Sequence, residues 1–381
     1  MSFQFRGARR ASVVILAGAL LAGSAAAEFK PEEVVVGPPI SAKSRAYLLD
    51  IAINHIQDGK VHIVDGDTLR YLGTVGSGFT GQSLVTPDKK DLIIATTYYS
   101  RGQRGDRSDV VEVWDADTLQ FKYEIPISPK RAMALNYQGL LRLSANSRWL
   151  LSQNATPATS VEVVDMQAKK AVGDVALPGC FGIYPAKSNP NRFATLCGDG
   201  TITTVTLDDN GGVASRATSD KVFDPDKDAW FVSAEQVGDT YYFVSFLGNL
   251  TAVNVGGDTA KVEGSFAMVT GADLKKKWRP GGYQVISIHG DRAYVTMHPD
   301  GAEGSHKNPA AEIWIIDIAK KKRITRMPGN EAVAVKTGED GMKLFAINPV
   351  KAELLVYDKL GPKPRVRKLQ VGEASLQLVA Y

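Results

Sequence analysis

Cysteine and histidine are scarce in this chain, and the common signatures of catalysis are missing. The 381 residues include two cysteines and five histidines. Neither a Gly-x-Ser-x-Gly nucleophile elbow nor a Walker phosphate loop occurs. Residue chemistry alone therefore favours a binding platform over a self-sufficient enzyme.

Long apolar runs are also missing, except for one near the N-terminus. That run, residues 13–22, follows three arginines and precedes Ala25-Ala26-Ala27. The pattern is typical of an export signal and predicts that residues 1–27 are a signal peptide, cleaved before Glu28. The run is too short to span a bilayer, so we expect a periplasmic protein without a membrane anchor. The pair Arg9-Arg10 leaves both Sec and twin-arginine export open.

Positive and negative charges are nearly balanced in number. The formal net charge is +4, and removing the signal, which has three arginines and no acid, leaves +1. Such a chain has no electrostatic attraction for nucleic acid or anionic membranes. The basic runs 275–277 and 320–323 are read as solvated turns, with a docking patch as the alternative.

A repeated strand pattern, apolar-x-apolar-x-Asp, occurs throughout the chain. Each copy alternates apolar and polar residues, as a half-buried strand does, and is followed by a turn and a second strand. The clear copies are 61–65, 111–115, 161–165, 313–317 and 354–358, and the degenerate copies are 204–208 and 250–254. Repeats at roughly fifty residues indicate blades that must stack on one another.

Seven copies predict an all-β fold, a seven-bladed β-propeller over residues 46–381. An extended, proline-rich arm is expected at residues 28–45. The final segment, Ser375–Tyr381, is an alternating strand that we expect to pair with N-terminal strands. Such pairing would close the ring and remove its sheet edges.

The two cysteines, Cys180 and Cys197, flank a turn-rich stretch. We expect them on adjacent antiparallel strands, and the exported location favours a disulfide. A metal site or a redox pair is the alternative. The spacing is not Cys-x-x-Cys and no histidine lies nearby in the sequence, which favours the structural bridge.

Two long loops interrupt the repeats, Tyr98–Asp109 and His298–Pro309. Both precede an apolar-x-apolar-x-Asp strand, so we expect them on the same face of the propeller. The first carries Arg101, Arg104 and Arg107, which suit a carboxylate ligand or ion pairs with acids of their own loop.

The second loop carries His298 and His306 together with Asp300 and Glu303. These residue types can bind a divalent metal. A glycine-rich loop gives them no fixed geometry, however, so we interpret the group as structural and predict no metal site.

Several longer stretches resemble a known family. They are Thr96–Leu119, Gln153–Ser160, Met297–Trp314, Trp278–Tyr283, Gly179-Cys180 and Cys197–Gly200. These stretches look like the heavy, β-propeller subunit of the tryptophan tryptophylquinone amine dehydrogenases. The likeness covers essentially the whole mature chain, and is closer to the aromatic (aralkylamine) branch than to the methylamine branch.

This resemblance implies a periplasmic heterotetramer of two heavy and two light subunits. The quinone would be built from two tryptophans of the light subunit, leaving no cofactor and no catalytic residue on this chain. The complex would oxidise primary amines to aldehyde and ammonia, and pass electrons to a blue copper protein such as azurin or amicyanin. Arg101, Arg104, Arg107, His298 and His306 are the predicted docking residues for the light chain or the acceptor.

One segment departs from the family. Where the family has a phenylalanine that lines the substrate channel, this chain offers Ile53 or Asn54. The resemblance thus predicts a wider channel. The alternative function is a stand-alone periplasmic propeller that binds a ligand or another protein, since a fold does not dictate function.

Overall fold

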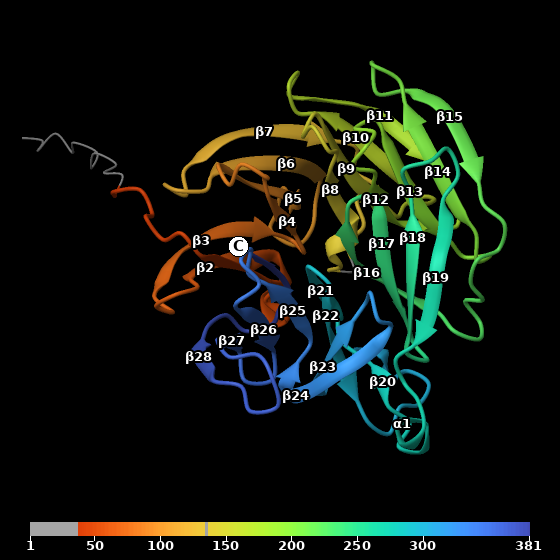
Figure 1. The fold of residues 1–381 in the computed structure, drawn as a ribbon. Helices are drawn as coiled ribbons and strands as arrows, with labels where there is room; N and C mark the ends of the chain where they lie inside the picture. Colours follow the sequence, from red (N-terminus) through yellow and green to blue (C-terminus); the bar gives the residue numbers. More distant parts are fainter. Residues whose placement is uncertain (1–36, 134–135) are drawn as a thin grey trace, which may run out of the picture. The chain divides into compact units, whose positions relative to one another are not determined.

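Seven antiparallel sheets stand in a ring, in the order of the sequence (Figure 1). The computed structural model describes residues 37–133 and 136–381, of which residues 38–381 form one unit. The prediction of a seven-bladed, all-β propeller is confirmed. The predicted signal peptide, residues 1–27, lies outside the described residues, as do residues 28–36 of the predicted arm.

Each blade is numbered here along the chain, with its strands given from the innermost to the outermost. Blade 1 contains β29 (Ser375–Ala380), β1 (Arg45–Asp50), β2 (Gly59–Asp65) and β3 (Tyr71–Gly78). Blade 2 contains β4 (Gln82–Val85), β5 (Asp91–Tyr99), β6 (Arg107–Asp115) and β7 (Phe121–Ile127). Blade 3 contains β8 (Leu141–Leu143), β9 (Trp149–Asn154), β10 (Ser160–Asp165) and β11 (Lys170–Ala176).

The second half of the ring repeats this order. Blade 4 contains β12 (Cys180–Pro185), β13 (Arg192–Cys197), β14 (Ile202–Leu207) and β15 (Val213–Thr218). Blade 5 contains β16 (Trp230–Val237), β17 (Thr240–Ser245), β18 (Asn249–Asn254) and β19 (Lys261–Ala267). Blade 6 contains β20 (Arg279–Pro280) and β21 (Ile286–His289), both paired with β22 (Arg292–His298), then β23 (Ala310–Asp317) and β24 (Lys322–Ala332). Blade 7 contains β25 (Ala334–Thr337), β26 (Leu344–Asn348), β27 (Glu353–Tyr357) and β28 (Val366–Gln370).

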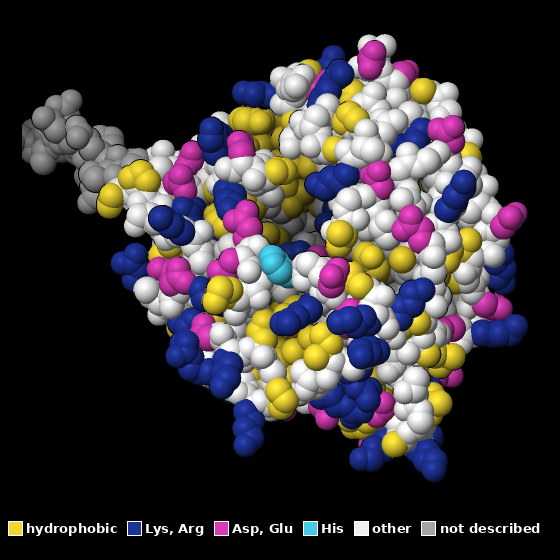
Figure 2. Space-filling model, in the orientation of Figure 1, with side chains coloured by type: hydrophobic (Ala, Val, Ile, Leu, Met, Phe, Trp, Pro, Cys, Tyr) yellow, Lys and Arg dark blue, Asp and Glu magenta, His cyan; other side chains and the backbone are white. Residues whose placement is uncertain are grey.

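The few helical turns of the described residues all lie in connections. They are η1 (Ile53–Asp58), η2 (Gln138–Leu140), α1 (Ala272–Lys275) and η3 (Ser305–Lys307). In the space-filling view the ring is hollowed near its middle, and basic and acidic side chains are interspersed around it (Figure 2).

All seven copies of the sequence repeat fall on the third strand of a blade. The recurring aspartate closes the turn that follows. Asp65 accepts hydrogen bonds from the backbone N–H groups of Asp67 and Thr68 at 2.8 and 3.0 Å, and Asp115 does the same two and three residues on. The fourth residue after the aspartate then turns left-handed, as at Leu69 with φ 60° and Leu119 with φ 56°. The repeated carboxylates are therefore turn-forming groups rather than catalytic ones.

The core is divided among the interfaces between neighbouring blades. Alternate residues of β5 illustrate this: Leu92 and Ile94 pack against blade 1, whereas Ile93 and Ala95 pack against blade 3. Each large side chain buried in this way contributes about 1.5–3 kcal/mol. Because both faces of every blade are buried, a blade depends on its two neighbours.

The ring closes where the last strand, β29, pairs antiparallel with β1. Ala46 lies opposite Ala380 and Leu48 opposite Leu378. Beyond the ladder, the hydroxyl groups of Tyr47 and Tyr381 lie 3.0 Å apart. The expected closure by the C-terminal segment is thus confirmed.

A buried carboxylate, Asp50, fastens this closure. It accepts hydrogen bonds from the backbone N–H groups of Ala52 at 2.8 Å and Ala374 at 3.0 Å, and from that of Glu373, so it links the end of β1 to the β28–β29 connection. Burial raises the pKa of Asp50, but contact with His62 and these N–H groups outweighs burial and lowers the pKa to about 2.

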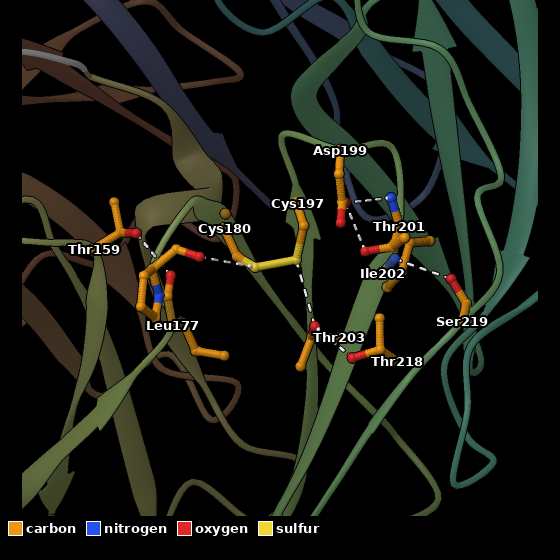
Figure 3. Close-up of a disulfide and its surroundings, with 12 residues drawn as sticks. Thr159, Leu177, Cys180, Cys197, Asp199, Thr201, Ile202, Thr203, Thr218 and Ser219 are labelled. Atoms are coloured by element: carbon orange, nitrogen blue, oxygen red, sulfur yellow. Dashed lines mark hydrogen bonds between the residues drawn. A yellow bond between two sulfur atoms is a disulfide. The ribbon is translucent and has the colours of Figure 1, made fainter.

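The disulfide joins the two innermost strands of blade 4. Cys180 of β12 lies directly opposite Cys197 of β13, and the structure bonds their sulfur atoms (Figure 3). Both cysteines are buried and belong to the core between blades 3 and 4. The bridge closes a loop between two cysteines that are 17 positions apart in the sequence.

Removing the disulfide should lower stability without changing the fold. For a loop of this length, the Cys180→Ser/Cys197→Ser variant should lose about 3 kcal/mol of unfolding free energy. Urea unfolding with and without reductant checks this. Reductant should destabilise the native protein and leave the double variant unchanged; equal sensitivity of both would contradict the prediction.

Asp50 should make ring closure sensitive to acid. Because its pKa is lowered in the folded protein, its contribution is complete above the ordinary carboxyl pKa and is lost as the pH falls towards about 2. Asp50→Asn should therefore cost about 2 kcal/mol at pH 7, and the cost should vanish between about pH 4 and pH 2. Urea unfolding across this pH range measures it, with the exposed Asp209→Asn as the control. A cost that stays constant with pH would refute the assignment.

Candidate functional site

Every predicted site residue lies at one end of the blades. In each blade the connection between the second and third strands emerges on the same face as the connection to the next blade, because neighbouring strands are antiparallel. We call this the loop face. It includes η1, residues 100–106 and residues 299–309. The prediction that the two long loops share a face is confirmed, although β5 and β6 extend further than expected and leave a shorter first loop.

The three arginines of the first loop differ sharply in environment. Arg101 and Arg104 are exposed, and neither side chain has a hydrogen bond or ion pair among the described residues. Arg107 instead forms a two-pronged ion pair with Asp109, with nitrogen–oxygen distances of 2.8 and 2.6 Å. Asp109 is fully buried, so Arg107 braces the loop and only the other two are free to dock.

The same carboxylate organises the connection between blades 2 and 3. Asp109 also accepts hydrogen bonds from the hydroxyl of Thr97 at 2.8 Å and the backbone N–H of Arg131 at 3.0 Å. The Arg131 guanidinium, 1% exposed, donates to the carbonyls of Phe79 and Thr80. Burial lowers the pKa of Arg131 to about 10, so it stays charged at neutral pH.

The two histidines of the second loop also differ in how far they are buried. His298 is 3% exposed, at the end of β22, and its Nδ1 lies 2.9 Å from the carbonyl oxygen of Pro299. It therefore lies beneath the surface, which does not fit the predicted docking role. His306, in η3, is exposed. Among the described residues, no three His, Cys, Asp or Glu side chains lie close enough to hold a metal ion.

The predicted channel residues, Ile53 and Asn54, are exposed in η1, with Ile53 at 60%. This turn contacts the arginine loop directly, since the Gln103 amide donates to the Gln57 side chain at 2.8 Å. The structure thus brings Ile53, Asn54, Arg101 and Arg104 to neighbouring loops of blades 1 and 2.

A pocket that the sequence did not reveal opens on the same face at blades 5 and 6. Its volume is about 570 Å³, and the lining includes Tyr137, Trp230, Phe231, Phe246, Glu303 and His306. We call it the aromatic pocket. These residues come from β16 and from connections far apart in the sequence, and only Glu303 and His306 lie in a loop that the sequence singled out.

A pair of tyrosines links the aromatic pocket to the centre of the ring. Tyr137 lies 6.2 Å, between ring centroids, from Tyr283. Tyr283 packs on Ile51 and Leu376 at the loop-face end of blade 1, and on Val333 in the connection between blades 6 and 7. It follows Gly282, whose φ of 127° suits glycine and whose hydrogen faces the backbone of Val333. The pocket therefore lies beside the axis rather than at the rim.

The sequence of this chain is similar to those of known proteins over most of its length. The sequence profile described as methylamine dehydrogenase heavy chain (MADH) matches residues 42–378. The methylamine dehydrogenase heavy chain of Methylophilus methylotrophus is 28% identical over 342 residues, which cover 88% of this chain and 83% of that protein. The heavy chain of Methylobacillus flagellatus is 29% identical over 349 residues, covering 89% and 84%.

Solved structures share the fold at much lower identity. A periplasmic gluconolactonase of Pseudomonas aeruginosa is 13% identical with a TM-score of 0.61, covering 88% of this chain and 98% of that one. A putative 6-phosphogluconolactonase of Bacteroides fragilis is 10% identical with a TM-score of 0.60, covering 92% and 100%. These likenesses concern the fold alone. Among the described residues, no helix is long and apolar enough to cross a membrane.

The arginine loop should separate into structural and docking residues when mutated. Arg107→Ala should cost about 3 kcal/mol of unfolding free energy, because the buried Asp109 loses its cation. Arg101→Ala/Arg104→Ala should change it by less than about 0.5 kcal/mol. Urea unfolding of the unsubstituted protein and of these two variants tests this. Equal stability of all three would show that Asp109 does not need Arg107.

Proposed function

Because this chain belongs to the methylamine dehydrogenase heavy chain family, we propose that it is the non-catalytic heavy subunit of a periplasmic, quinone-dependent amine dehydrogenase. The match over residues 42–378 carries the proposal. Two such chains would assemble with two light subunits, which hold tryptophan tryptophylquinone. The complex converts a primary amine and water to an aldehyde and ammonia, and releases two electrons and two protons.

The residues of this chain do not fit the quinone itself. Such a cofactor needs two adjacent tryptophans that substrate can reach. The pair nearest to this arrangement is Trp278 and Trp314, with ring centroids 5.5 Å apart, but they are only 6% and 0% exposed. The guanidinium groups of Arg323 and Arg326 also stack on Trp314, at 4.3 and 4.6 Å from its centroid. These tryptophans are core residues of blade 6, so we assign the cofactor to the light subunit.

The loop face is the proposed docking surface. Ile53, Asn54, Arg101 and Arg104 lie on adjacent loops there, and Ile53 is 60% exposed. On the same face, Leu247 in the loop between β17 and β18 is 40% exposed. An interface of this kind combines an apolar centre with polar neighbours. On this proposal the light subunit covers η1, and the arginines dock either the light subunit or the blue copper acceptor, such as azurin or amicyanin.

The proposed substrate is a primary amine of the aralkyl type. The support comes from the sequence stretches that resemble the aromatic branch and from η1, where Ile53 and Asn54 offer no aromatic ring to narrow a channel. An aliphatic and a polar side chain leave more room than a phenylalanine does. A bulky amine is therefore favoured over methylamine.

The proposal predicts that this chain is inactive alone and active with its partner. Amine-dependent dye reduction is measured for the chain expressed alone and for the chain co-expressed with a light subunit. We expect no turnover without the light subunit, because this chain supplies no quinone. Robust turnover by this chain alone would overturn the assignment, and the absence of any co-purifying small subunit would favour a stand-alone binding propeller.

The docking residues are tested by two measurements on the co-expressed complex. Arg101→Ala/Arg104→Ala should reduce the amount of light subunit that co-purifies or the rate of electron transfer to the copper protein. The matched control is Lys359→Ala/Lys363→Ala, which removes two exposed cations from the β27–β28 turn on the opposite face. Equal losses in both variants would indicate a general charge effect rather than docking.

A further inference from the structure

We propose that a second pocket, at the end of the ring axis opposite the loop face, binds a small organic carboxylate through Arg142. Residues of β29, β4, β8, β12 and β16, the innermost strands of blades 1 to 5, line this pocket, and we call it the axial pocket. Val85 and Leu143 end their strands there, where each chain turns towards the second strand of its blade. The site is therefore separate from the proposed docking surface.

Arg142 supplies an unpaired charge to the axial pocket. Its guanidinium lines the pocket and has no hydrogen bond or ion pair among the described residues, although its Nε atom is buried. Burial raises the pKa of Tyr184 and of Tyr241, and the positive charge of Arg142 opposes that rise, so the guanidinium lies near both phenol groups. Both hydroxyls donate to backbone carbonyl groups instead. A buried donor without an acceptor is unfavourable, so the guanidinium is suited to an oxygen ligand.

The rest of the lining adds positive charge and no negative charge. Lys187, in the connection between β12 and β13, is exposed and has no ion pair among the described residues. No Asp or Glu of the described residues lines the pocket. Because the planar fork of an arginine matches the two oxygens of a carboxylate, the lining favours an anion of this type.

The carboxylates beside the pocket have other partners. Both oxygens of Glu235 lie 2.9 Å from the ammonium of Lys336. Asp239 accepts the backbone N–H of Lys187 at 2.6 Å, and Asp88 accepts hydrogen bonds from groups of its own turn. These three acids form no ion pair with Arg142, which leaves its guanidinium available to a ligand.

The apolar part of the lining favours an organic anion over an inorganic one. Leu84, Val85, Leu143 and Val379 line the pocket and are only partly buried. An inorganic phosphate would place oxygen atoms against these aliphatic side chains, where the oxygens lose water without gaining a partner. The volume is about 180 Å³. Since a cavity of about 150 Å³ can hold a benzene ring, a carboxylate with a body of about four carbons fits.

Calorimetric titration of the purified full chain with sodium butyrate, at constant ionic strength, tests the proposal. We expect saturable binding with one site per chain. Neutral butyramide, which has nearly the same shape, and inorganic phosphate should each bind at least about tenfold more weakly. Arg142→Met keeps an unbranched side chain but removes the guanidinium, and should weaken butyrate binding by about tenfold or more.

A pair of lysine variants provides a second test that does not depend on folding of the Arg142→Met protein. Lys187→Ala should weaken butyrate binding roughly 2- to 5-fold, because an exposed cation contributes less than a buried one. The matched control is Lys359→Ala, which removes an exposed cation from the β27–β28 turn on the same face and should leave the affinity unchanged.

Four results would overturn the proposal. They are an absence of saturable binding, equal affinity for butyrate and either comparison compound, undiminished binding by folded Arg142→Met, and equal affinities of the two lysine variants. Circular dichroism establishes whether Arg142→Met is folded, and if it is not, the lysine pair decides. None of these measurements depends on turnover or on the light subunit, so failure here is distinct from failure of the proposed function.

Discussion

The pairing of β29 with β1 is the interaction on which the rest of the propeller depends. Without β29, blade 1 has three strands and an open inner edge, and the core between blades 7 and 1 loses Leu378 and Ala380. Every other blade is buried on both faces by neighbours, so an opening at one interface weakens the support of all. Asp50 strengthens this closure, because one buried carboxylate satisfies backbone N–H groups on both sides of the junction.

The closed ring determines what the loop face can do. Connections that are far apart in sequence emerge side by side, and each is held at its base by two stacked blades. Asp109 shows how a loop is anchored: it is fully buried, bound by Arg107 and by the backbone of Arg131, and lies at the base of the exposed arginines. Rigid blades with variable connections are a common way to build binding surfaces.

Much of the fold was predictable from sequence because it depends on local patterns. The repeated aspartates identified the third strands, since each carboxylate must accept N–H groups of its own turn. The shared face of the long loops follows from the same repeat, and the closing strand follows from the alternating apolar pattern of Ser375–Tyr381. Side-chain burial within the loops was not predictable. Nothing in the sequence distinguishes the buried His298 from the exposed His306, or the braced Arg107 from the free Arg101, because packing between blades decides each case. The aromatic pocket was missed for a related reason, as its residues meet only in the folded ring.

The closure of the ring also imposes an order in time. The strands β1 to β3 are synthesised first, but the strand that completes their blade is synthesised last. The end of β1 at Asp50 and the start of β29 at Ser375 are 325 residues apart (375 − 50), which takes roughly 16–65 s at about 5–20 residues per second, and during that interval the inner edge of β1 has no partner. An unpaired strand edge is a template for pairing with other chains. The first blade is therefore the part of this protein that most needs protection from aggregation while it is being made.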